Sequence, residues 1–362
     1  MQLSRCTLRA PKRGAFGHRR PARSTRCVVV ASTRQDVLLR SLSEAAEVSV
    51  MVVDGTQFVA EAQRRHRLAP TATGVLGRAL LGAMMMGAFR KEEEQVQVVF
   101  QGDGPAGSVL AIADTRGNVR GKIDNPAVDP PLRPDGKLDV GAAVGKGVLA
   151  VVRSHPLQPQ PYTGLVPIVS GEVAEDLASY LVDSEQTNSA LGLGVSLDRE
   201  CRVKSAGGWM IQVLPFCSEE TLARVEANLQ ALPPISTLLN EGSSAADITA
   251  RILEGLGVAP DAESIVPTYG PCDEETIKGR MLRVLASLGK EEVADIIRTE
   301  GKLEVTCDLC AQTYLFAQQE VDSYIDSGRD TASDFFPEDD CNDDDEEEVA
   351  EGQPAEAAAV AE

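Results

Sequence analysis

Two cysteines near the end of this 362-residue chain, Cys307 and Cys310, have the residue type and spacing best suited to chemistry. A C-x-x-C pair is either half of a metal site or a dithiol suited to oxidation. Strand-like residues flank the pair within the stretch 302–316 (KLEVTCDLCAQTYLF). A turn between two strands is typical of zinc knuckles, whereas thioredoxin-type dithiols begin a helix whose dipole lowers a thiol pKa. The context therefore favours a metal site.

The other cysteines do not form the regular framework of a disulfide-rich secreted domain. Cys6 and Cys27 lie in the N-terminal segment, and six cysteines follow them. Six is too few, and their spacing too uneven, for such a framework in a chain of this length. In a reducing organelle they indicate metal or redox chemistry instead. Cys341, which lies in an acidic tail, is predicted to be a free thiol.

The charge distribution indicates a targeting segment. Residues 1–32 carry eight Lys or Arg and no acid, whereas the rest carries 27 basic and 55 acidic residues. A basic, Ser- and Arg-rich start without a long apolar run is typical of an organelle transit peptide. We predict a transit peptide over residues 1–32 and a location in the chloroplast stroma, with the mitochondrion as the alternative. The acidic remainder would repel phosphate backbones, and no apolar run is long enough for a membrane span, so neither nucleic acid nor membrane is expected as a partner.

Residues 33–217 are predicted to form an α+β core domain with a mixed or antiparallel sheet and helices. Residues 48–54 are strand-like and end at a turn, after which Thr56 is the expected N-cap of a helix. Pro70 opens a second, longer apolar helix. Three short runs within residues 95–124 alternate with Gly and Asp turns, which predicts an antiparallel meander.

Two further patterns in this domain have plain structural explanations. Residues 102–107 match G-x-G-x-x-G, but the sequence continues as a strand, so a glycine-rich hairpin is favoured over a dinucleotide site. Residues 171–190 are predicted to form one amphipathic helix. Its acids are interpreted as a solvated face rather than acid–base pairs: Glu172, Glu175, Asp176 and Glu185.

The residue pattern after position 217 differs from that of the core domain. Residues 218–262 are predicted to be a helical linker that begins at the N-cap Ser218 and has too little apolar surface for its own core. Its apolar faces must therefore pack on a neighbour. Residues 263–326 form the small cysteine-bearing unit. Residues 327–362 hold 14 acids and one arginine, which predicts a disordered tail.

Four segments resemble, in the same order, segments of the 33-kDa heat-shock chaperones. They are GDGPAGSVLAIADTRGNVRG, GEVAEDLASYLVDSEQTNSA, GWMIQVLP and VTCDLCAQTYLF. The similarity spans roughly residues 34–320. It implies an α/β core, a metastable helical linker and a C-terminal zinc unit. It also implies a redox-regulated, ATP-independent holdase rather than an enzyme, with unfolded or misfolding proteins as clients and no catalytic residues.

The resemblance further implies a zinc site of four thiolates, from a C-x-C pair and a later C-x-x-C pair. Cys307 and Cys310 match the second pair, and Cys272 matches the first, in which Gly270 replaces the other cysteine. We therefore expect one Zn²⁺ per chain on Cys272, Cys307 and Cys310, in a site lacking one family ligand. The candidates for the fourth ligand are water, Asp273, Cys217 and Cys201. Oxidation is expected to join Cys307 to Cys310, and a homodimer is among the expected oxidised states.

Two other functions remain open at this point. The chain would be a constitutive holdase if the substitution at Gly270 has removed the redox switch. It would be a thiol–disulfide oxidoreductase if Cys307 and Cys310 turn over substrate disulfides. The sequence has no Walker A motif, so nucleotide use is not expected.

Overall fold

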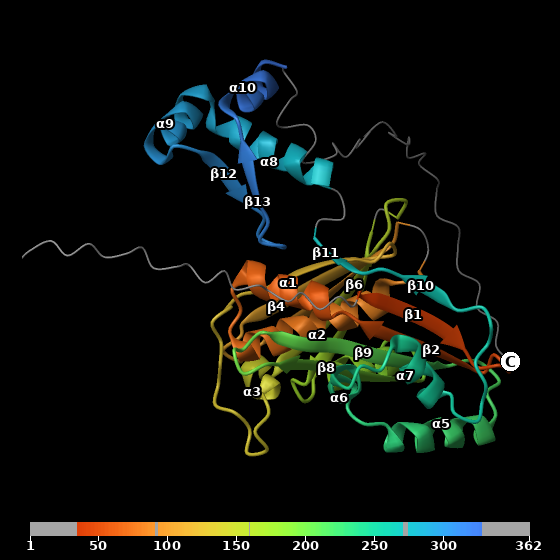
Figure 1. Cartoon of the computed structure of the whole chain (residues 1–362). Helices are drawn as coiled ribbons and strands as arrows, with labels where there is room; N and C mark the ends of the chain where they lie inside the picture. Colours follow the sequence, from red (N-terminus) through yellow and green to blue (C-terminus); the bar gives the residue numbers. More distant parts are fainter. Residues whose placement is uncertain (1–34, 91–92, 159, 271–273, 328–362) are drawn as a thin grey trace, which may run out of the picture. The chain divides into compact units, whose positions relative to one another are not determined.

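The computed structural model describes residues 35–90, 93–158, 160–270 and 274–327 (Figure 1). The predicted transit peptide and most of the acidic tail lie outside the described residues. The strands before the linker are β1 (Val37–Leu42), β2 (Val48–Asp54), β3 (Gln95–Gly102), β4 (Ser108–Asp114), β5 (Asn118–Ile123), β6 (Gly147–Ser154), β7 (Tyr162–Ile168), β8 (Ser189–Leu197) and β9 (Val203–Val213). The helices there are α1 (Thr56–His66), α2 (Pro70–Gly87), α3 (Val140–Val144) and α4 (Val173–Asp183).

Two sheets enclose α2. One has the strand order β10-β1-β2-β9-β8, and the other has the order β11-β5-β4-β3-β6-β7. The meander β3-β4-β5 is antiparallel, as predicted, and the glycine-rich stretch joins β3 to β4 as a hairpin. Helix α2 contacts strands of both sheets, which explains why it is apolar on all sides. The α+β class of the core is therefore confirmed. No helix in the described ranges is both long and apolar enough to cross a membrane.

One proline starts α2, and small residues such as Gly82 allow the helix to pack closely between the sheets. Pro70 stands in the first turn, where its missing N–H costs no hydrogen bond. At Gly82 a Cβ atom would lie 2.3 Å from Cδ1 of Leu177 in α4. A larger side chain would therefore push the two helices apart. This close packing leaves Leu80 and Met84 fully buried.

The N-terminus of α1 is capped differently from the prediction. Gly55, not Thr56, is the N-cap, and it makes no side-chain cap bond. The buried carboxylate of Asp36 instead accepts hydrogen bonds from the backbone N–H groups of Gln57, at 2.9 Å, and Phe58, at 2.7 Å. Burial raises the pKa of Asp36 to about 6, against the lowering effect of these two bonds.

Helix α4 is shorter than predicted. It ends at Asp183 because Gln186 adopts φ of 53°, and β8 begins at Ser189. The interpretation of its acids as a solvated face is correct only for Glu175, which is exposed. Asp176 is fully buried and accepts hydrogen bonds from the backbone N–H groups at positions 169 and 170. The other two acids form ion pairs: Glu172 with Arg78 and Arg133, and Glu185 with Arg153 and Arg90.

The linker folds as three helices on the outer face of the five-stranded sheet. They are α5 (Glu219–Ala231), α6 (Ile235–Asn240) and α7 (Ala245–Ile252). Ser218 caps α5, as predicted, and Ser244 forms a capping box with Asp247 at α7. Leu238 and Ile248 are fully buried in one cluster with Val50 of β2. The expectation that the linker packs on a neighbour is therefore confirmed.

We expect this linker to be the most labile part of the described chain. In α5 only Thr221 and Val225 are buried, so few apolar contacts hold it. Hydrogen exchange of the reduced protein, followed by mass spectrometry, should show lower protection over residues 218–262 than over 171–214. Helix α2 is the internal standard for full protection. Equal protection of the two regions would contradict a metastable linker.

The chain returns to the core before it enters the C-terminal unit. Strand β10 (Glu263–Ile265) pairs with β1, and β11 (Thr268–Tyr269) pairs with β5. The boundaries of the predicted domains remain predictions, but five of the residues 263–269, those in β10 and β11, belong to the core sheets. Their short strands connect the linker to the cysteine-bearing unit.

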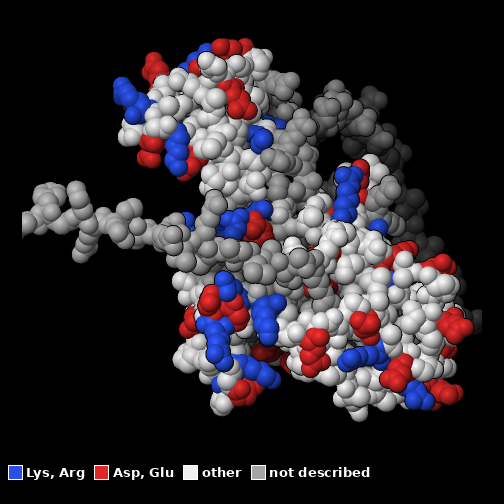
Figure 2. Space-filling model, viewed as in Figure 1, with Lys and Arg blue, Asp and Glu red and all other residues white. Residues whose placement is uncertain are grey.

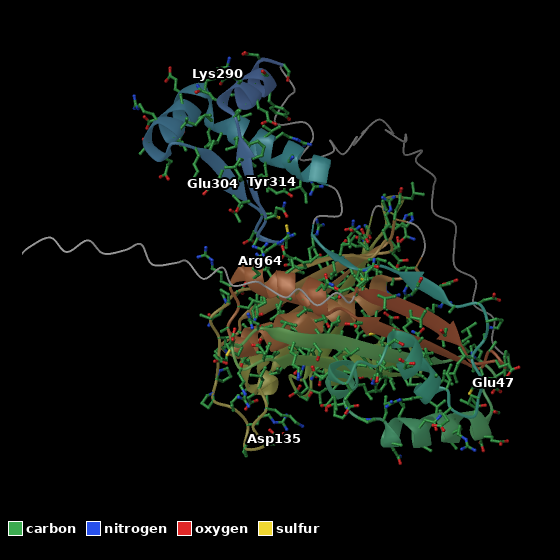
Figure 3. The ribbon with its side chains drawn as sticks, viewed as in Figure 1. Glu47, Arg64, Asp135, Lys290, Glu304 and Tyr314 are labelled. Carbon is green, nitrogen blue, oxygen red and sulfur yellow. The ribbon has the colours of Figure 1, made fainter. Side chains whose placement is uncertain are left out.

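The C-terminal unit has its own small core. It comprises α8 (Glu274–Leu288), α9 (Lys290–Glu300), β12 (Leu303–Thr306), β13 (Thr313–Phe316) and α10 (Gln318–Asp326). Seven buried side chains, among them Val293 and Tyr314, form this core. Figure 3 labels Tyr314 and Glu304, which lie on the two strands of its hairpin; the first is buried and the second exposed. Partly buried side chains such as Ile277 and Ile297 pack against it, and the core as a whole is small.

Candidate metal and redox site

The two cysteines occupy the turn between β12 and β13, as the strand-like flanks predict. The strands pair in antiparallel register from Leu303↔Phe316 to Thr306↔Thr313. The backbone N–H of Cys307 donates to the carbonyl of Gln312 at 2.8 Å, and the N–H of Ala311 donates to the carbonyl of Cys307 at 2.8 Å. Ala311 has φ of 49°, which turns the chain back after the second cysteine. The turn thus brings both thiols to one side.

The two thiols lie within hydrogen-bond distance and behave as a coupled pair. The S–H of Cys310 donates to the sulfur of Cys307, and this bond lowers the pKa of Cys307 to about 5. The same bond, together with burial, raises the pKa of Cys310. Cys307 is half-buried and Cys310 fully buried. The thiolate character of the pair is therefore greater at Cys307 than at Cys310.

Cationic and aromatic groups surround this pair. The guanidinium groups of Arg120 and Arg65 favour the ionised forms of Cys307 and Cys310, respectively. Arg65 also lies 5.3 Å from the ring centroid of Tyr269. Asp308, between the two cysteines in the sequence, forms an ion pair with Lys122 of β5.

Tyr269 lies beside the dithiol and ties it to the core. Its hydroxyl is 2.7 Å from Nε2 of His66 and donates to the carbonyl of Gly121 at 3.1 Å. Burial and then the electrostatic effect of the neighbouring Cys310–Cys307 pair raise the pKa of Tyr269. Burial and the nearby Arg65 lower the pKa of His66, so its imidazole is mostly neutral at pH 7.

The chemistry of the turn fits half of a zinc site. Two thiols on a strand–turn–strand element, one of them with a lowered pKa, match the donors that structural zinc prefers. Cys272 lies outside the described residues, as does Asp273. Within the described ranges, no group of three or more His, Cys, Asp or Glu side chains has the geometry of a metal site. Cys201 and Cys217, two of the candidates for the fourth ligand, therefore do not join Cys307 and Cys310 in this structure.

Few atoms surround position 270, where the resemblance implies a family cysteine. Gly270 follows Tyr269, and among the described residues, chain neighbours aside, a Cβ atom added to it would meet only a guanidinium nitrogen of Arg65, at 4.0 Å. Its backbone N–H donates to the carbonyl of Val119 at 3.1 Å, which fixes the segment on β5. A thiol at this position would thus find space beside Tyr269, but Gly270 has φ of 159°, so any side chain here requires the backbone to shift.

Gly270→Cys should accordingly tighten zinc binding, by roughly tenfold or more, because it adds a thiolate to an incomplete set. It should also raise the oxidant dose needed to release the metal. Competition with a chromophoric chelator gives the affinity. The matched control is Gly270→Ala, which restricts the backbone in the same way but adds no thiolate ligand. Equal zinc affinities of the Cys, Ala and wild-type proteins would contradict the expected ligand position.

Comparisons with known proteins agree with the sequence resemblance. The family model described as Hsp33 protein matches residues 36–317. The 33 kDa chaperonin of Desulforamulus reducens is 38% identical over 287 residues, which are 79% of this chain and 96% of the relative. The 33 kDa chaperonin of Thermus thermophilus is 40% identical over 297 residues, covering 80% and 86%. The crystal structure of the 33 kDa chaperonin of Thermotoga maritima is similar with a TM-score of 0.69 and 35% identity, over 81% of this chain and 99% of that one.

Proposed function

The chain belongs to the Hsp33 family of chaperones, which are not enzymes, and on that premise we propose that it is a redox-regulated, ATP-independent holdase. Its clients would be unfolding proteins, and its activity would be switched on by oxidation of zinc-ligating thiols. The observation that supports this switch most strongly is the dithiol turn, in which the hairpin of β12 and β13 holds a half-buried Cys307 beside a buried Cys310. The hydrogen bond from Cys310 lowers the pKa of Cys307 and so favours its thiolate form. A thiolate of this kind is both a zinc ligand and the form of cysteine that reacts with peroxide.

In the reduced state, Cys307 and Cys310 would hold Zn²⁺ together with Cys272, one ion per chain. When bound, zinc would tie the hairpin to the segment that carries Cys272 and so stabilise a unit with a small apolar core. Arg65 and Arg120 would offset the negative charge of the thiolates. The ion pair between Asp308 and Lys122 would hold the turn against β5.

In the oxidised state, a disulfide would join Cys307 to Cys310. The S–S bond forms as the two thiolates give two electrons to peroxide, whose O–O bond breaks, and with two protons from solvent the peroxide leaves as two molecules of water. The metal then loses two of its ligands. We propose that the C-terminal unit loosens, that the contacts of Cys310 with the core are lost, and that the linker follows, exposing apolar surface to clients. Oxidised chains would include homodimers.

The cellular site is also a proposal. The basic, acid-free residues 1–32 support import into the chloroplast stroma, with the mitochondrion as the alternative. Import of a fluorescent fusion carrying residues 1–40 tests this directly. Fluorescence outside both organelles would contradict it.

Two other functions are separated from the proposed one by simple measurements. An oxidoreductase would process many substrate disulfides per molecule, whereas a holdase suppresses aggregation only near a one-to-one ratio with its client. Titrating the peroxide-treated protein against a heat-unfolded client should therefore give near-stoichiometric suppression. Catalytic disulfide turnover would overturn the proposal. Full suppression by the reduced protein would favour a constitutive holdase.

A further inference from the structure

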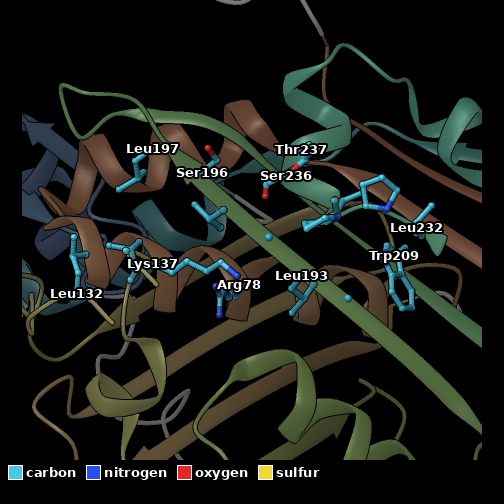
Figure 4. A pocket seen from close by; sticks show the side chains of 18 of the residues that line it. Arg78, Leu132, Lys137, Leu193, Ser196, Leu197, Trp209, Leu232, Ser236 and Thr237 are labelled. Carbon is cyan, nitrogen blue, oxygen red and sulfur yellow. The ribbon is translucent and has the colours of Figure 1, made fainter. Parts of the chain in front are cut away.

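A groove of about 720 Å³ lies between the linker and the core, away from the dithiol (Figure 4). Its core side consists of Arg78, Leu132 and residues 136–138 of one loop, the strand segment 192–197, Cys201 and Trp209. Its linker side consists of residues 229–237. A volume of this size and a largely apolar lining are typical of small-molecule sites.

The charge of the lining is unusual for so acidic a chain. The protein has 55 acidic residues and a net charge of −20, yet none of the side chains that line the groove is a carboxylate. Two cations line it: Arg78, which is paired with Glu172 outside the lining, and Lys137. The side chain of Lys137 is 75% exposed, and its only ion pair in the described part of the chain, to Asp135, is 3.6 Å long. Lys137 is therefore free to turn toward an anion. Figure 2 shows several Lys and Arg side chains, with Asp and Glu among them, over the region of α3 and its neighbouring loop.

The cations and most of the apolar side chains lie at opposite ends of the groove. In Figure 4 Lys137 and Arg78 lie toward one end with Leu132, and Trp209 and Leu232 lie toward the other, with Leu193 between them. The strand segment that forms the floor, residues 192–197, is about 17 Å long at roughly 3.3 Å per residue. The groove thus has an elongated apolar part that ends at positive charge.

We propose that this groove binds a linear amphipathic carboxylate of the fatty-acid class. The carboxylate would lie at Lys137 and Arg78, and the alkyl chain would lie along Leu193 toward Trp209 and Leu232. An extended peptide is the main competing occupant, because β8 is an edge strand whose free backbone groups could pair with it. The apolar side chains of the lining favour an alkyl chain, since any peptide amide left unpaired among them weakens binding. An alkyl chain makes no such demand.

Such a ligand would act on the linker, because it contacts the linker and the core together. It binds only while residues 229–237 lie on the core, so binding stabilises that state by linkage. This consequence depends on the proposed function, whereas binding itself does not. A bound fatty acid should raise the oxidant dose that activates the chaperone, and oxidation should in turn weaken fatty-acid binding.

Trp209 permits a direct test because it is the only tryptophan in the chain and lines the groove. The reduced, full-length mature protein is titrated with dodecanoate below its micellar concentration, and tryptophan fluorescence is recorded. We expect a saturable change, weakened about 15-fold for decanoate, since each CH₂ removed costs about fourfold in affinity. Lys137→Glu should weaken dodecanoate about tenfold. The matched control, Lys146→Glu, makes the same charge change at an exposed lysine outside the lining and should leave the affinity unaltered.

Several results would overturn the proposal. They are the absence of a saturable change, equal affinities for Lys137→Glu and wild type, and equal affinities for dodecanoate and dodecanol. A synthetic peptide of residues 334–348, which holds two Phe and ten acids, is added as a competitor. If it binds more tightly than dodecanoate, the groove is a site for the chain's own tail and the fatty-acid assignment is wrong. If dodecanoate binds as expected but the activating peroxide dose does not rise, the site stands and its regulatory role is refuted.

Discussion

Cys310→Ser should lower the zinc content of the reduced mature protein from about one ion per chain to near zero. A serine hydroxyl is a poor zinc ligand, and loss of a thiolate from a set of three leaves too few donors to hold the ion. Zinc binding by structural thiolate sites contributes about 10–16 kcal/mol, so even partial loss removes most of the stability of a small unit. Zinc is measured by elemental analysis and by release to a chromophoric chelator after metal-replete purification.

The same loss should be visible in the fold of the C-terminal unit. Hydrogen exchange over residues 274–327 should rise toward the rate of an unfolded chain in Cys310→Ser, while α2 stays protected. Cys217→Ser is the matched control, because Cys217 is a half-buried thiol outside the dithiol turn. If Cys310→Ser retains one zinc per chain, or if Cys217→Ser loses it, the assigned ligands are wrong.

Ile248→Ala should activate the protein without oxidant. Ile248 is fully buried between α7 and the outer face of the five-stranded sheet. Truncating such a side chain costs about 2–4 kcal/mol of packing, which is a large fraction of what holds a metastable linker to the core. The linker should then detach in a substantial share of the reduced molecules and expose its apolar face together with that of the sheet.

The measurement is suppression of client aggregation by the reduced variant, alongside hydrogen exchange over residues 218–262. Leu222→Ala is the matched control, because Leu222 lies in the same linker but is 38% exposed. It should leave both readouts near wild type. If Ile248→Ala frees the linker but does not suppress aggregation, the linker is not the element that controls client binding.

Local signals in the sequence were sufficient for a large part of the fold. Pro70 and Ser218 mark helix starts that the structure confirms, and the meander and the hairpin around Cys307 follow from nearby residues. The dithiol turn was predictable for the same reason, because its strands and its two thiols lie within fifteen residues. The family resemblance added the ligand expectation for Cys272, which lies outside the described residues.

Long-range contacts determine the features of the structure that the sequence did not predict. The cap of α1 comes from Asp36, twenty-one residues before the N–H group of Gln57, and no local pattern shows that connection. The contacts of Tyr269 with Arg65 and His66 join segments about 200 residues apart. Asp176 looked solvated because its neighbours in the helix are polar, yet the chain before the helix folds over it. The groove at Trp209 is likewise a product of the folded linker.

The central claim is that oxidation of the Cys307–Cys310 pair switches the chaperone on. The most direct test measures aggregation of a heat-unfolded client in the presence of wild type and Cys307→Ser, each before and after peroxide. We predict that reduced wild type is inactive and becomes active after peroxide, whereas Cys307→Ser, having lost its zinc, is active in both states. The account is contradicted if Cys307→Ser is as inactive as wild type when reduced and as active as wild type after peroxide.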